Sequence, residues 1–192
     1  MLLAAILAIT LAGCDLSGKL EDSAPSAEGP GPEVSVPEAS PPDAAVETLP
    51  PAVQAKLDLI RETLKTGSIR SLVRLANQEP DFRSNFGNLN HYDHWYILKR
   101  MGLDVIEKTE QVLNQPYGVK DFGAEKYYIW PELAARPPED LVYSRLTFQE
   151  RAALLELVSE AGIERVKGGE PYPGFRLAIR EDGSWAYLLQ DN

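Results

Sequence analysis

The stretch from Asp15 to Pro51 limits what this chain can fold into. It contains eight of the fifteen prolines and no aromatic residue, and its eight acidic side chains and one base give it a net charge of -7. Such a segment has too little apolar surface to offset the entropy lost on ordering. We therefore predict that residues 14–51 form a disordered, acidic, proline-rich tether and that folding is confined to residues 52–192.

Residues 52–192 have the size and composition of one globular domain. They hold 21 acids and 18 bases, so most of the net charge of -10 belongs to the tether. A domain of about 140 residues can bury one core. The acidic balance argues against nucleic acid as a partner, because phosphate binding needs clustered Lys and Arg. A single Cys excludes an intrachain disulfide and a multi-cysteine metal site.

Residues 1–13 form a short apolar segment that stops at Cys14. As a helix it would rise about 20 Å at most, which is too short to cross a hydrocarbon core about 30 Å thick. Leu11-Ala12-Gly13-Cys14 resembles the lipobox of bacterial lipoproteins, although no Lys or Arg precedes the apolar stretch. The resemblance implies a signal peptide over 1–13, a lipidated Cys14, and a periplasm-facing, membrane-anchored protein of the cell envelope. Asp15 has two interpretations: an inner-membrane retention signal, as Asp after the Cys is in enterobacterial lipoproteins, or the first residue of the acidic tether, so the choice between inner and outer membrane stays open.

Apolar periodicity predicts the helices. Helical spacing runs from Val53 to Leu64 and from Ile69 to Ala76, with Ser68 as a cap between the two. Further helices are expected over His91–Met101 behind Asn90, over Val105–Leu113, and from the capping box Thr147–Glu150 to Gly162. Residues 81–89 are expected to form a loop or a short strand.

The end of the chain predicts a β-hairpin. Phe175, Leu177 and Ile179 alternate with polar or small residues, and a second alternating set, Trp185, Tyr187 and Leu189, follows Asp182-Gly183. Tyr127–Trp130 is a further strand-like run that Pro131 ends. The predicted fold class is α+β, with four to five helices packed on a small, mostly antiparallel sheet that ends in this hairpin.

Three blocks of the domain resemble an uncharacterised family of secreted and lipid-anchored proteins of alphaproteobacteria. The blocks are Tyr127–Pro131, Tyr172-Pro173-Gly174-Phe175-Arg176 and Ile179–Trp185. The resemblance covers roughly residues 60–190 and implies no known activity.

The two histidines lie together in His91-Tyr92-Asp93-His94-Trp95. On a helix, His91 and His94 share one face. With a carboxylate from elsewhere they could bind a metal such as zinc, and with Asp93 they could act as acid–base groups. A zinc site needs at least three protein ligands, and the sequence shows two here, so histidines on an aromatic helix surface remain the third interpretation. No cofactor is predicted.

Trp and Tyr are frequent in this domain and suit a ligand groove, because they combine an apolar body with a polar tip. The candidate ligand-binding residues are Trp95, Trp130, Tyr172 and Arg176, and Arg176 could hold a carboxylate. The alternative is an ordinary aromatic core. The predicted function is a non-catalytic periplasmic module that binds an envelope protein, a peptide or a glycan. The alternatives are a small cell-wall hydrolase using His91, Asp93 and His94, and an envelope metal-binding protein.

Overall fold

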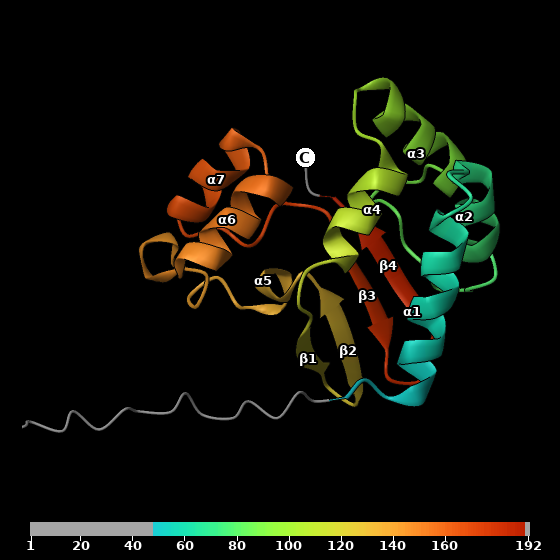
Figure 1. Cartoon of the computed structure of the whole chain (residues 1–192), viewed down its shortest axis with the longest axis horizontal. Helices are drawn as coiled ribbons and strands as arrows, with labels where there is room; N and C mark the ends of the chain where they lie inside the picture. The colour runs from blue at the N-terminus through green and yellow to red at the C-terminus, as the bar shows by residue number, and fades with distance from the viewer. Residues whose placement is uncertain (1–47, 191–192) are drawn as a thin grey trace, which may run out of the picture. The chain divides into compact units, whose positions relative to one another are not determined.

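A four-stranded antiparallel sheet forms the centre of the fold, with its strands side by side in chain order, β1-β2-β3-β4 (Figure 1). The computed structural model describes residues 48–190. The predictions for residues 1–13, for Cys14 and for most of the tether therefore lie outside the described residues. The elements in order are α1 (Pro51–Leu64), α2 (Ile69–Ala76), α3 (His91–Arg100), α4 (Val105–Leu113), β1 (Gly118–Phe122), β2 (Glu125–Trp130), α5 (Glu132–Ala135), a 3-10 turn (Tyr143–Arg145), α6 (Phe148–Leu157), α7 (Glu160–Lys167), β3 (Arg176–Arg180) and β4 (Trp185–Leu189).

Side-chain caps determine where most of the helices begin. Each cap accepts a hydrogen bond from a backbone amide of the first turn, which has no partner within its own helix. The capping residues are Ser68 at α2, Asn90 at α3, Asp104 at α4, Thr147 at α6 and Ser159 at α7. At α6 the predicted capping box is complete, because the Glu150 carboxylate also accepts from the Thr147 amide at 2.6 Å.

One face of the sheet, the inner face, packs against α1 and α4, both of which contact β3 (Figure 1). The predicted apolar positions of α1 are all buried there: Val53, Leu57, Ile60 and Leu64. The sheet contributes Tyr128, Trp130, Leu177, Ile179, Trp185 and Leu188 to the same core. A second, smaller cluster lies on the outer face, where Ile129, Ala178 and Ala186 pack with Ala135 of α5.

A β-bulge changes the predicted facing of the last strand. Leu177 pairs with Leu188 and Ala178 with Tyr187, but Ile179 pairs with Trp185, so β4 has one residue more than β3 at this point. Because a bulged residue shifts the alternation of side chains, Trp185 joins the inner core and Tyr187 joins the outer cluster. The expectation that both rings share one face was therefore wrong.

The helix predicted to run from Thr147 to Gly162 is divided in two. Val158 is extended, with φ -124° and ψ 139°, and Ser159 then caps α7. Gly162 lies inside α7, where a Cβ would come within 2.4 Å of Val158 and 3.0 Å of Pro173. A tight contact between helix and loop, rather than a helix end, explains this glycine.

The α+β class and the C-terminal hairpin are confirmed, with differences in detail. Residues 48–190 contain seven helices, two more than the upper estimate, and one of the additional helices is the four-residue α5. The strand β1 was not predicted. Residues 81–89 contribute one bridge, in which Arg83 pairs with Tyr187 at the edge of β4. No helix among the described residues is long and apolar enough to span a bilayer.

Candidate functional site

The histidine cluster lies where the sequence placed it, at the start of α3, but its contacts are structural. His91 Nδ1 lies 2.8 Å from Ser84 Oγ, and its ring packs edge-on against Phe82 with the ring centres 5.0 Å apart. Burial lowers the pKa of His91. Burial and then the nearby charge of His91 lower the pKa of His94. These contacts attach the loop before α3 to the helix.

The partners that catalysis or metal binding would need are engaged elsewhere or missing. Asp93 supports the helix cap, where its backbone amide donates to Asn90 and its carboxylate accepts from the Asn90 amide group at 2.6 Å. Ser84, the hydroxyl beside His91, is 1% exposed and so is closed to a substrate. Within the described part of the chain no group of three His, Cys, Asp or Glu side chains could hold a metal ion.

The four candidate ligand-binding residues do not form one site. Trp95 and Trp130 are 0% and 2% exposed, so both rings lie in the core and present no surface to a ligand. Tyr172 is also buried, and burial raises the pKa of its hydroxyl above the ordinary value. Arg176 lies on the outer face, where it donates to the Tyr172 carbonyl at 3.4 Å and its guanidinium sits 6.0 Å from the centre of the Phe86 ring.

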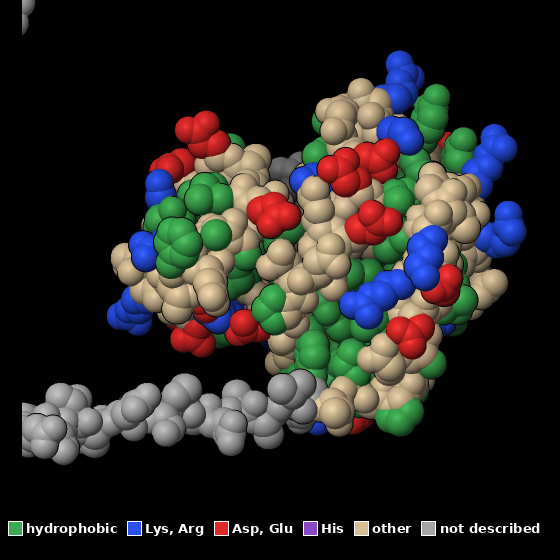
Figure 2. Space-filling model, in the orientation of Figure 1, with side chains coloured by type: hydrophobic (Ala, Val, Ile, Leu, Met, Phe, Trp, Pro, Cys, Tyr) green, Lys and Arg blue, Asp and Glu red, His purple; other side chains and the backbone are tan. Residues whose placement is uncertain are grey.

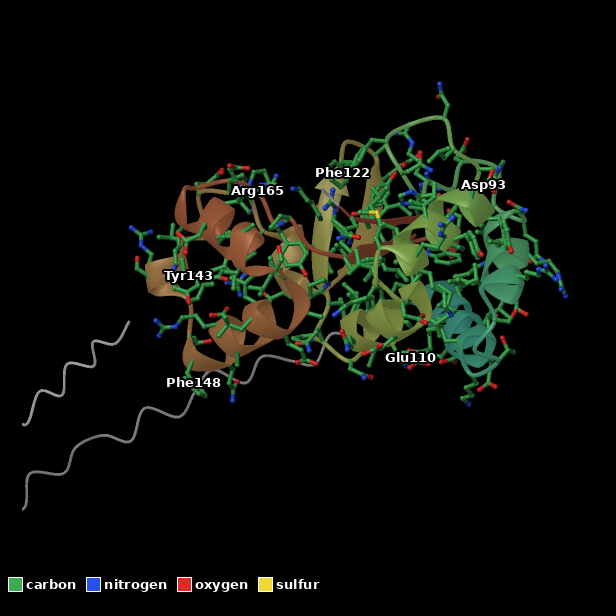
Figure 3. All side chains as sticks on the ribbon, turned by 90° about the horizontal axis from the view of Figure 1, so that it is seen from above. Asp93, Glu110, Phe122, Tyr143, Phe148 and Arg165 are labelled. Atoms are coloured by element: carbon green, nitrogen blue, oxygen red, sulfur yellow. The ribbon has the colours of Figure 1, made fainter. Side chains whose placement is uncertain are left out.

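An open cleft of about 670 Å³ lies on the outer face of the sheet. We call it the outer-face cleft. Its lining includes Pro80, Arg83, Phe122, Tyr127, Arg180 and Tyr187, together with one acidic residue, Asp81. Seen from above, Phe122 lies on the side of the sheet opposite to Glu110 of α4 (Figure 3).

Strand register places polar side chains in this cleft and, in the case of Lys120, beside it on the same face of the sheet. Lys120 of β1 pairs with Tyr127 of β2, and Tyr127 pairs with Arg180 of β3. Paired residues of antiparallel strands point to the same face, so the three side chains form a row across the sheet. Arg83 lies beyond β4 through its bridge to Tyr187, whose partner on β3 is Ala178, so it is offset by two residues from Arg180; we call Lys120, Arg180 and the offset Arg83 the row. Three cationic side chains therefore cross the outer face of an acidic chain.

The cations lie against aromatic rings. Lys120 Nζ is 5.3 Å from the centre of the Phe122 ring, and the Arg180 guanidinium carbon is 5.5 Å from that of Tyr127. The two rings meet edge to face, with centres 5.1 Å apart and planes at 84°. Cation–π attraction of this kind holds a charge at the surface without burying it. On the helix-bearing face, acidic and basic side chains are interspersed (Figure 2).

The hairpin turn fixes the position of Arg180. Its Nε donates to the Tyr127 hydroxyl at 3.1 Å and another guanidinium nitrogen donates to Ser184 Oγ at 3.2 Å, while Ser184 donates to Asp182 at 2.7 Å. Glu125 is its ion-pair partner at 3.5 Å and accepts from the Tyr127 hydroxyl at 2.6 Å. The hydrogen bond to Tyr127 is the main cause that raises the pKa of Arg180.

Tyr187 adds a neutral hydroxyl to the cleft. Burial raises its pKa to about 12, against the opposing influence of Arg176. The hydroxyl is therefore protonated at neutral pH and can both donate and accept. Fixed guanidinium groups, a lysine and tyrosine hydroxyls are the groups with which proteins bind carboxylates and other oxyanions.

No known protein family, curated protein or solved structure matches this chain. The residues of the cleft themselves must therefore carry the functional argument.

Of the residues on the outer face, only Arg176 was predicted from the sequence as a ligand-binding residue, and the row was not predicted. Lys120 and Phe122 were missed because β1 was not predicted. The sequence did contain a signal, namely Gly123 between Phe122 and Glu125. Gly123 lies in the two-residue turn that joins β1 and β2, where its φ is 68°. Arg180 was placed on the polar side of the hairpin, but its alignment with Lys120 depends on strand register, which one strand alone does not reveal.

Proposed function

We propose that this protein is a lipid-anchored, periplasm-facing protein of the cell envelope whose domain is a non-catalytic binding module. The lipobox-like Leu11–Cys14 and the acidic tether support the anchored arrangement. The described domain supports binding, because two cations of its outer face lie against aromatic rings and Arg180 is also held by a hydrogen bond to Tyr127. On this proposal the domain recognises an anionic envelope component at the outer-face cleft.

The row of Lys120, Arg180 and Arg83 across the sheet is the single observation that carries this proposal. The domain has a net charge of -3, so a row of cations on one face is not a consequence of overall composition. A ligand with oxyanions would replace water on these groups and form charge-assisted hydrogen bonds. Its attraction would extend beyond contact distance and weaken as salt is added.

Binding of anionic probes to the full chain in detergent micelles tests the proposal. We expect tri-galacturonate or hexaglutamate to bind, and their neutral counterparts maltotriose and hexaglutamine not to bind, in isothermal titration calorimetry at low salt. The double variant Lys120→Gln with Arg83→Gln should weaken binding about tenfold, the size of effect expected for losing charge-assisted contacts. Lys99→Gln with Lys108→Gln, on the helices, is the matched control and should bind as the unaltered protein does. Equal binding by neutral and anionic probes would contradict the proposal.

A further inference from the structure

We propose that the ligand of the outer-face cleft is an extended acidic peptide in polyproline II conformation, with carboxylates at every third residue. This inference rests on the proposed function and narrows it to one class of ligand. It follows from two properties of the row: its aromatic rings already contact cations, and its cations have a defined spacing.

The aromatic rings of the cleft are poorly placed for a sugar. Glycan grooves stack a sugar ring flat on an open aromatic face. Here Lys120 covers the Phe122 ring and Arg180 covers the Tyr127 ring. The rings also contact each other edge to face. A ligand on this surface therefore meets the cations first and the edges of the rings second. This arrangement favours a chain with flexible acidic side chains over a flat carbohydrate ring.

The cations are separated by distances that strand geometry sets. Neighbouring strands lie about 4.8 Å apart, so Lys120 on β1 and Arg180 on β3 are about 10 Å apart at the backbone. Arg83 lies beyond β4, next to Tyr187, whose partner on β3 is Ala178, two residues from Arg180. Two strand spacings across and two residues along place Arg83 roughly 12 Å from Arg180.

A polyproline II peptide matches this spacing. It has three residues per turn and a rise of about 3.1 Å per residue, so every third side chain lies on one face at intervals of about 9 Å. The difference between this interval and the roughly 10 to 12 Å that separate neighbouring cations of the row is within the reach of Glu side chains. In a β-strand the same face recurs every second residue, at about 6.7 Å, so three carboxylates span about 13 Å, compared with about 18 Å in polyproline II and roughly 20 Å between the backbones of Lys120 and Arg83. Proline residues between the acids would hold the extended form and pack against the exposed Pro80.

The ligand must also compete with a carboxylate of the domain. Glu125 is 60% exposed at its side chain and pairs with Arg180 at 3.5 Å. A peptide carboxylate that binds Arg180 displaces this partner in part. Removing the charge of Glu125 should therefore tighten binding of an acidic ligand, whereas it should have little effect on a ligand that does not reach Arg180.

Fluorescence anisotropy with labelled peptides and the full chain in detergent micelles tests the spacing. The probe is Glu-Pro-Pro-Glu-Pro-Pro-Glu, and the matched control, Pro-Pro-Glu-Glu-Glu-Pro-Pro, has the same charge with its acids adjacent. We expect the spaced peptide to bind about tenfold more tightly than the control. Glu125→Gln should strengthen its binding about threefold, as expected for loss of a surface ion pair. Lys120→Gln with Arg83→Gln should remove the preference for the spaced peptide.

Three outcomes would overturn the inference. If both peptides bind equally, the spacing argument is wrong. If tri-galacturonate binds more tightly than either peptide and is weakened by Lys120→Gln with Arg83→Gln, the ligand is an acidic glycan and the proposed function still stands. If no anionic probe binds, both the inference and the proposed function fail. Circular dichroism of each variant checks that its fold is unchanged.

Discussion

At the scale of single residues, His91 and His94 should make the stability of the domain depend on pH. Burial lowers both pKa values, so the unfolded chain, with an ordinary value near 6.5, binds protons that the folded chain rejects. We therefore expect the free energy of unfolding to fall as pH drops from about 7 to about 5.5. Urea unfolding at a series of pH values, compared with His91→Gln with His94→Gln, measures this. The carboxylates with lowered pKa, such as Asp104, titrate at lower pH, and an unchanged slope in the double variant would contradict the prediction.

At the scale of elements, the junction of α6 and α7 should depend on Gly162. Helix propensity alone predicts that Gly162→Ala stabilises α7 by up to about 1 kcal/mol. The added Cβ would, however, lie 2.4 Å from Val158 Cγ1 and 3.0 Å from Pro173 Cγ. Overpacking of this kind costs about 1 to 3 kcal/mol, so we expect net destabilisation in chemical unfolding. Val158→Ala should recover part of the loss in the double variant, because it removes the closer clash. If Gly162→Ala stabilises the domain, the contact is not tight.

Among the elements, some features could be predicted from the sequence and others could not. Helix starts were predictable because a cap such as Asn90 or Thr147 acts within three residues of itself. The break at Val158 was missed although Ser159, which caps α7, is a signal of the same kind, because the apolar run continues on both sides of it. The row of Lys120 and Arg180 was missed because it depends on the register of three strands. Local interactions leave a local signature, whereas the cleft arises from pairings between distant segments.

At the scale of the whole molecule, Cys14 should decide whether the protein fractionates with membranes. None of the helices described between residues 48 and 190 is long and apolar enough to span a bilayer. Two or more acyl chains give stable anchoring, since each buried CH₂ contributes about 0.8 kcal/mol. We expect the unaltered protein in the membrane fraction of cells. We expect the Cys14→Ser variant either in the soluble fraction or as a precursor that still carries its signal peptide. Mass spectrometry of the N-terminal peptide should show a lipid on Cys14, the chain's single Cys. A Cys14→Ser protein that is processed at Gly13 and still sediments with membranes would show that binding by the domain, rather than lipid, holds it there.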